Sequence, residues 1–272
     1  MKMNPQPTTP APLPVIATIR AAFQFVWDKR EQMLRALAIP MAFLFVLEAV
    51  PYIIEMISEV PDKPEEDIHG LMWRLSILLS IPFYILFAIT CHRLVLVGDQ
   101  AVPAYGNLTW NQRETRFLGW CVVVSLAYLL IIITIPIGVS LLSMFVADSG
   151  TSPSEITDSI WQGFMYLLML PSIYLISRLS LVYPATAVDR QVNLTWAWNL
   201  SHFNGWRLMV VVGLLPWVFS FREDLLLREN ATLVESLLVV TIGLVLLAVE
   251  VVALSFSYKH LVEQVAPPAY GS

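Results

Sequence analysis

Long runs without a charged side chain are the feature that most constrains the fold of this chain. Residues 117–147 are 31 consecutive positions without Asp, Glu, Lys or Arg, and residues 75–92 and 159–177 form similar runs of 18 and 19. A helix of roughly 20 apolar residues crosses the hydrocarbon core of a bilayer, which is about 30 Å thick. With 57% apolar and 14% charged residues, the chain has too few charges to cover a soluble globule, which carries about 25%. A soluble enzyme, a secreted disulfide scaffold, a disordered chain and a coiled coil are excluded.

Six transmembrane helices are predicted, because helices satisfy every backbone polar group within a lipid-facing segment. The expected spans are residues 33–57, 72–97, 118–146, 160–187, 206–222 and 233–258. The fifth is short, so it either crosses the bilayer with help from the apolar residues 225–227 or re-enters on the same side. The expected fold class is an all-α membrane protein with six transmembrane helices arranged as three hairpins.

The basic residues predict the orientation. With the N-terminus inside, the inner segments hold twelve basic residues: Lys2, Arg20, Lys29, Arg30, Arg35, Arg93, Arg113, Arg116, Arg178, Arg190, Arg207 and Lys259. The outer segments hold four: Lys63, Arg74, Arg222 and Arg228. The positive-inside rule therefore places both termini in the cytoplasm. Residues 1–14, with five prolines, are predicted to be a disordered cytoplasmic tail without a cleavable signal, followed by a membrane domain at 15–262 and a second tail at 263–272.

A sequence repeat with an offset of 86 lies in the middle of the chain. Asn107-Leu108-Thr109-Trp110 recurs as Asn193-Leu194-Thr195-Trp196, and the register continues to Gly119-Trp120 and Gly205-Trp206. We predict a parallel internal repeat, in which each copy is an interfacial amphipathic helix followed by an out-and-back hairpin. A third, divergent copy is predicted at the start, where one helical face holds Val15, Ile16, Ile19, Phe23, Val26 and Trp27. Five tryptophans are predicted to anchor the inner interface: Trp27, Trp110, Trp120, Trp196 and Trp206.

Four ionisable residues inside the predicted spans are the candidate functional residues: Glu48, His92, Arg178 and Glu250. A charge at the centre of a transmembrane helix costs about 2.5–3.5 kcal/mol on insertion scales, so such residues mark functional sites by default. His92, Arg178 and Glu250 have similar predicted depths, which fits either a proton- or anion-linked cluster or a structural Arg178–Glu250 pair with His92 donating to a carbonyl. Glu48 is either a protonated carboxyl bonded to a neighbouring helix or part of a transport route.

No motif in the sequence predicts catalysis, a cofactor or a metal site. Glycine-rich phosphate loops, metal-binding histidine pairs and nucleophile elbows are missing from the sequence. Cys91 and Cys121 are expected to be free thiols. The expected partners are the lipid bilayer, whose anionic headgroups at the inner face attract the basic residues, and a second membrane protein. Nucleic-acid binding is excluded because the basic residues are spread along membrane linkers.

One stretch of the sequence resembles a known family. The residues that carry the resemblance are Arg178-Leu179-Ser180-Leu181, Pro184-Ala185, Asp189, Ala197-Trp198, Ser201 and Gly205-Trp206-Arg207. They resemble the membrane domain attached to some bacterial glycerophosphodiester phosphodiesterases, and its stand-alone six-helix relatives of unknown function. The resemblance covers residues 178–216 and implies a bacterial inner (cytoplasmic) membrane location with six helices and interfacial segments. It implies no catalytic residues, because the soluble phosphodiesterase domain has no counterpart in this sequence.

Two functions follow as hypotheses. The first is a non-catalytic multi-pass inner-membrane protein that acts by packing or partner recruitment in the bacterial envelope. The alternative is a small-molecule or lipid transporter that uses the intramembrane charged residues. A polar cavity lined by those residues favours transport, and a solid helical bundle favours the first hypothesis.

Overall fold

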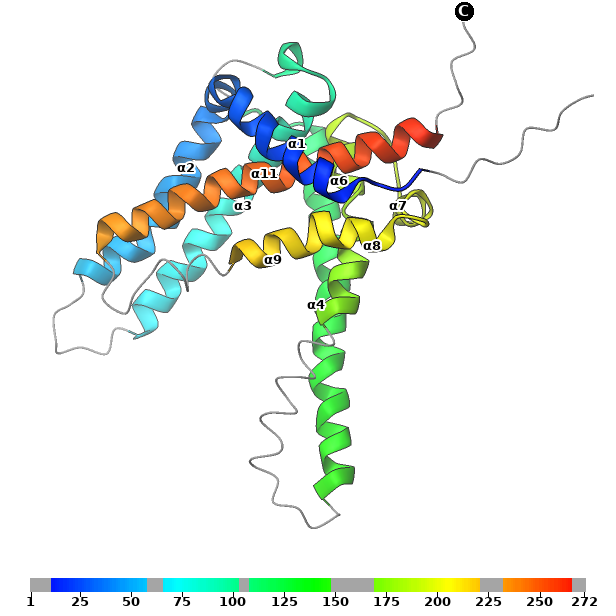
Figure 1. The fold of residues 1–272 in the computed structure, drawn as a ribbon. Helices are drawn as coiled ribbons and strands as arrows, with labels where there is room; N and C mark the ends of the chain where they lie inside the picture. Colours follow the sequence, from blue (N-terminus) through cyan, green and yellow to red (C-terminus); the bar gives the residue numbers. More distant parts are fainter. Residues whose placement is uncertain (1–10, 58–65, 103–107, 148–168, 221–231, 266–272) are drawn as a thin grey trace, which may run out of the picture.

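The computed structural model describes residues 11–57, 66–102, 108–147, 169–220 and 232–265 (Figure 1). Within these ranges every regular element is a helix and no strand is present. Among the described residues, four helices are long and apolar enough to cross a membrane, and a fifth candidate is counted if one bent helix pair forms a single span. The prediction of an all-α membrane protein is confirmed at this level.

Four of the predicted spans coincide with long helices. They lie in α2 (Arg30–Ile57), α3 (Glu66–Leu96), α4 (Gln112–Ala147) and α11 (Leu233–Val265). Each helix contains a long apolar run with most of its charges near its ends, which favours a buried or lipid-facing helix over any water-exposed structure; Glu48 in α2 and Glu250 in α11 are exceptions. Helix α11 continues to Val265 and therefore includes the first three residues of the tail predicted at 263–272, whose remaining residues lie outside the described residues.

The predicted span 160–187 is not one helix in its described part. Residues 169–179 are helical, Ser180 and Leu181 form a turn, and α6 (Val182–Ala187) follows. Pro184 explains the break, because it has no N–H to bond the carbonyl of Ser180 and its ring would clash with that carbonyl in a continuous helix. Residues 160–168 of this prediction lie outside the described residues.

The predicted span 206–222 consists of α8 (Gly205–Leu208), the π-helical turn η2 (Met209–Leu214) and α9 (Leu215–Ser220). Pro216 removes the N–H that would bond the carbonyl of Val212, so the regular hydrogen-bond pattern cannot continue through this turn. The preceding α7 (Leu194–Leu200) meets this segment at an angle of 103°. Residues 221 and 222 lie outside the described residues.

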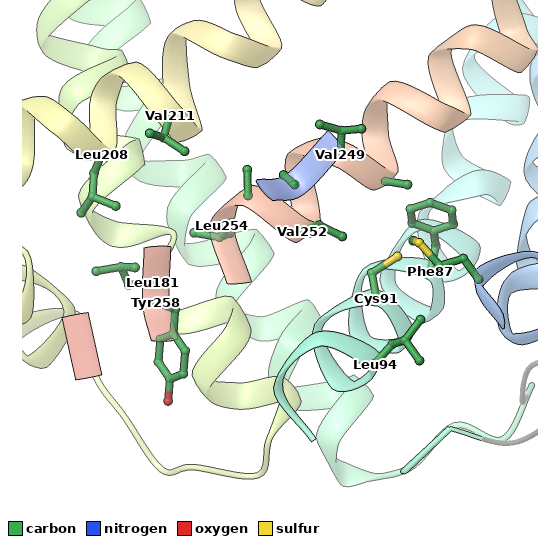
Figure 2. Close-up of a cluster of buried hydrophobic side chains, with 14 of the residues drawn as sticks. Phe87, Cys91, Leu94, Leu181, Leu208, Val211, Val249, Val252, Leu254 and Tyr258 are labelled. Carbon is green, nitrogen blue, oxygen red and sulfur yellow. The ribbon is translucent and has the colours of Figure 1, made fainter. Parts of the chain in front are cut away.

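The helices pack around α11, which lies against α1, α2 and α3 (Figure 1). The core contains residues from α3, α6, α8 and α11, including Phe87, Cys91, Leu208, Val249 and Val252 (Figure 2). The α2 and α3 helices form a closely packed antiparallel pair, whereas α4 extends away from the other helices and contacts α3 and α6 near its start. This arrangement places the middle of α11 beside α2 and α3.

Glycines allow close helix packing between residues 169–179 and the α8–η2 segment. A Cβ added to Gly213 would lie 2.3 Å from Ile173 Cγ2, and one added to Gly205 would lie 2.5 Å from the Tyr174 hydroxyl. A larger side chain at either position would force its neighbours or the two segments to move. Small residues at such contacts are typical of helix packing in membranes.

The predicted amphipathic helix at the start of the chain is present as α1 (Val15–Asp28). Its apolar residues are divided between two faces, unlike the single face that the sequence predicted. Thr18 and Ala22 are buried against the bundle, whereas Ile16 and Trp27 are 82% and 71% exposed. Leu13 is also buried, and its N–H donates to Asn204 Oδ1 at 2.7 Å, so the predicted tail at 1–14 ends before Leu13. Residues 1–10 lie outside the described residues.

Ion pairs join several helix ends on one side of the molecule. Asp189 binds both Arg93 (3.3 Å) and Arg113 (2.9 Å), and therefore connects the end of α3, the start of α4 and the segment between α6 and α7. Lys29 lies 3.8 Å from Asp99, which adds the start of α2. We call this side the Asp189 end. Three of the inner segments predicted from the basic residues thus meet at this end: the start of α2, the α3–α4 connection and the segment between α6 and α7.

The two copies of the predicted repeat differ in local structure. Residues 108–111 are not helical, whereas the matching segment of the second copy forms α7. In the second copy, Asn193 Oδ1 accepts the N–H of Trp196 and begins the helix there. In the first copy, Glu114 accepts the N–H of Asn111 and begins α4 later. The position matching Glu114 is Leu200, which cannot accept this bond.

Candidate functional site

Two of the four intramembrane candidates line one cavity. Glu48 on α2 and Glu250 on α11 both border a partly open cavity of about 140 Å³, and both are half-buried. Tyr52 and Tyr84 add aromatic rings and hydroxyl groups to the lining. The remaining lining comes from α11: Val239, Val240, Gly243, Leu244, Leu246 and Leu247. The cavity therefore combines two carboxyl groups with an otherwise mostly apolar wall, and we call it the carboxylate cavity.

Packing of α2 against α3 and α11 positions the polar groups of the carboxylate cavity. Glu48 and Tyr52 are four residues apart on α2 and lie on one helical face. Tyr84 on α3 donates its hydroxyl to Glu48 Oε1 at 2.5 Å. Glu48 thus accepts a hydrogen bond from a neighbouring helix, as one of the two hypotheses for it required, and its protonation stays a prediction. Tyr52 and Tyr84 were not predicted as site residues, although each places a hydroxyl within an apolar run.

The carboxylate cavity is rich in hydrogen-bond acceptors. Ionised carboxylates only accept hydrogen bonds, and tyrosine hydroxyls both donate and accept. Such a set suits a cation or a donor group better than an anion. Among the described residues, no group of three or more His, Cys, Asp or Glu side chains is placed to hold a metal ion.

His92 lies apart from the carboxylate cavity, in the contact between α3 and α11. It is 1% exposed, and its Nδ1 lies 2.7 Å from Ser255 Oγ. Because the Ser255 hydroxyl donates to the carbonyl of Val251 at 2.8 Å, it accepts from His92, which places a proton on Nδ1. The predicted bond from His92 to a carbonyl is therefore replaced by a bond to a hydroxyl.

Arg178 lies in a second separate environment, between the helix at 169–179 and α7. Its guanidinium donates to Ser201 Oγ at 2.8 Å, to the Tyr174 hydroxyl at 3.2 Å and to the carbonyl of Trp198. The guanidinium carbon also lies 3.4 Å from the centre of the Trp198 ring, which is a cation–π contact. The side chain is 3% exposed, so these contacts replace its hydration.

The predicted pairing of Arg178 with Glu250 is not found in the part of the chain that the structure describes. Arg178 is bonded to neutral groups of its own helix and of the α7 segment, whereas Glu250 lines the carboxylate cavity. The pairing was inferred from similar depth along the membrane normal, and depth does not specify which helices are adjacent. The structure therefore separates the four candidates into one shared cavity and two individual sites.

The predicted tryptophan anchors differ in exposure. Trp27, Trp110 and Trp206 are exposed, at 71%, 42% and 69%, as side chains at a lipid or water interface would be. Trp120 and Trp196 pack against the core, and the ring of Trp196 lies 6.3 Å from that of Tyr258. The predicted equivalence of Trp110 and Trp196 thus does not extend to their packing.

Several residues that carry the family resemblance lie together in space. Arg178, Trp198 and Ser201 form the contacts given above, and Gly205 packs against Tyr174. These residues join the helix at 169–179 to the α7–α8 corner. Comparison of the chain with protein families, with curated proteins and with solved structures gave no match.

Proposed function

We propose that this chain is a multi-pass membrane protein that binds and transports a small organic cation through the carboxylate cavity. The observation that carries this proposal is that Glu48 and Glu250, from helices at opposite ends of the sequence, line the same cavity. Carboxyl groups within a membrane are costly and are typical of substrate or ion pathways. The cavity supports the transport hypothesis over a solid bundle that acts only by recruiting partners.

The size and lining of the cavity favour a small ammonium ion. An apolar protein cavity of about 150 Å³ holds a molecule the size of benzene, and the carboxylate cavity measures about 140 Å³. An ammonium ion would gain from the two carboxyl groups and from the aromatic rings of Tyr52 and Tyr84, since cations are attracted to such rings. It would also reduce the cost of holding two carboxylates in a medium of low dielectric constant.

The wider arrangement belongs to the same proposal. We propose six spans with both termini in the cytoplasm of a bacterium, and a location in its inner membrane. The gathering of Lys29, Arg93 and Arg113 at the Asp189 end supports a common side for these segments. The resemblance of residues 178–216 supports the inner membrane. The repeat is retained as an evolutionary duplication whose copies have diverged in local structure.

Binding can be measured with tetramethylammonium, which keeps its charge at every pH. The purified protein in detergent should show a higher melting temperature in millimolar tetramethylammonium chloride, since a ligand at 100 times its Kd stabilises the folded state by about 2.7 kcal/mol. The paired variant Glu48→Gln with Glu250→Gln should lose this shift. Glu263→Gln is the matched control, because Glu263 is an exposed glutamate on α11 outside the cavity.

Transport requires a separate measurement. Proteoliposomes with an inside-negative potential should accumulate radiolabelled tetramethylammonium, and the paired glutamine variant should not. Equal uptake by the wild type, the paired variant and empty vesicles would reject the transport proposal and favour partner recruitment. An equal thermal shift with sodium chloride would reject specific binding.

A further inference from the structure

A second cavity lies at the Asp189 end, between the end of α3 and the start of α4. It has a volume of about 210 Å³ and is separate from the carboxylate cavity. Its polar lining consists of two arginines, one carboxyl group and three neutral side chains: Arg93, Arg113, Glu114, Thr90, Thr109 and Asn111. Its apolar lining includes Leu86, Ile89 and Val102. The cavity is therefore amphipathic, with two guanidinium groups beside aliphatic side chains.

The two arginines are held in place, and each keeps donors that are unbonded among the described residues. Arg93 donates through Nε to the carbonyl of Ala101 (3.3 Å) and through Nη1 to the carbonyl of Ala187 (3.1 Å). Arg113 donates through Nε to Asp189 Oδ1 at 2.9 Å. A guanidinium has five N–H donors, and Nη2 of either arginine makes no hydrogen bond to the described residues. Their side chains are 20% and 24% exposed, so fixed donors remain accessible to a ligand.

We propose that this cavity binds the phosphate group of a phospholipid, with Arg93 and Arg113 as the donors. Guanidinium groups recognise phosphate oxygens through paired hydrogen bonds. Thr90 and Asn111 add further donors to the lining. The aliphatic wall would contact the glycerol and the first acyl carbons, which inorganic phosphate lacks. The cavity lies at the Asp189 end, where charged residues cluster, and this end would lie at the headgroup level of a bilayer.

The charges around the cavity favour a zwitterionic headgroup over an anionic one. The two arginines are balanced by Asp189, which binds both, and by Glu114, which lies 3.7 Å from Arg113. A ligand without net charge preserves this balance. The phosphate of phosphatidylethanolamine would bind the arginines, and its ammonium would lie toward Asp189, whose side chain is 55% exposed. This inference does not depend on cation transport by the carboxylate cavity.

Lipid binding can be tested by native mass spectrometry of the delipidated protein in detergent. Dihexanoyl phosphatidylethanolamine, dihexanoyl phosphatidylglycerol and inorganic phosphate would be titrated separately. The ethanolamine lipid should bind most tightly. Arg113→Gln should weaken its binding about tenfold or more, because a hydrogen bond to a charged group is lost. Thr90→Val, which keeps the side-chain shape and leaves the ion pairs intact, should also weaken binding of the ethanolamine lipid. This variant tests the site if Arg113→Gln fails to fold.

Arg30→Gln is the matched control for charge. Arg30 lies at the same end, donates to the carbonyl of Trp27 and does not line the cavity. Unchanged lipid binding by Arg30→Gln, together with weaker binding by the cavity variants, would support the site. Equal binding by wild type and both cavity variants would overturn it. Tighter binding of phosphatidylglycerol would overturn the zwitterionic preference, and equal binding of inorganic phosphate would overturn the role of the aliphatic wall.

Discussion

Arg178 provides a sharp test of the contacts described above, because its partners differ from the one that its position in the sequence suggests. It is bonded to Ser201 at 2.8 Å and to neutral groups of Tyr174 and Trp198. A hydrogen bond to a charged group contributes about 1.5–3 kcal/mol. The variant Arg178→Met removes this bond without leaving a buried carboxylate unpaired, since no carboxylate among the described residues is bonded to it.

Two double-mutant cycles measure these couplings. The cycle of Arg178→Met with Ser201→Ala should give a coupling of about 1.5–3 kcal/mol. The cycle of Arg178→Met with Glu250→Leu should give less than about 0.5 kcal/mol, the value typical of sites that share no contact. The free energy of unfolding would be measured in mixed micelles by tryptophan fluorescence as SDS is added. A buried ion pair with Glu250 would instead give a coupling of about 3–5 kcal/mol with Glu250 and none with Ser201. That result would refute the assignment of Ser201 as the partner of Arg178.

Three further outcomes follow from the packing and the backbone. Gly213→Ala should lower the free energy of unfolding by about 1–3 kcal/mol through overpacking. Its control is Gly119→Ala, whose Cβ would meet nothing within 4 Å and which should leave the free energy of unfolding unchanged or raise it. Equal melting temperatures of the two variants would contradict the close helix contact at Gly213. Asp189→Asn should lower the free energy of unfolding by at most about 1 kcal/mol, because the ion pairs of Asp189 are partly exposed. Asp189→Ala should lower it by about 1–2 kcal/mol more, because φ is 61° there and alanine is strained in this left-handed conformation. Chemical unfolding of the two variants and the wild type measures this order of stability. Single cysteines at Asn111 and Lys259, in a protein without Cys91 and Cys121, should react with an impermeant maleimide from the same side of the membrane, and labelling from opposite sides would contradict a shared end.

The long helices were predictable from sequence because each requires only local information. A long run with few or no charges has few alternatives to a membrane helix; α3 and α4 follow uncharged runs, and α2 and α11 follow apolar runs interrupted by isolated charges. The break before α6 was harder to place. Pro184 indicates a kink, but the apolar residues on both sides of it suggest one continuous span.

The grouping of the candidate residues could not be predicted from sequence. Glu48 and Glu250 were recognisable as charges within apolar runs, but their shared cavity depends on α11 packing against α2. The same limit explains the incorrect partner of Arg178. Its true partner, Ser201, is separated from it in the sequence by a turn, the short helix α6 and a linker. The path of the chain through these segments depends on φ and ψ values that the side-chain pattern does not specify.

The bond between Leu13 and Asn204 has a consequence for biosynthesis. The two residues are separated by 191 positions, and a ribosome adds about 5–20 residues per second. The emerging Leu13 segment therefore waits about 10–40 s before its partner exists. During that interval α1 cannot occupy its final place, and its row of Ile16, Phe23 and Trp27 gives it a means of resting on the membrane surface. Although α1 precedes the other described helices in the sequence, it is thus among the last of them to reach its native position, and a nascent chain that ends before Asn204 should still expose α1 to a protease or to a chaperone.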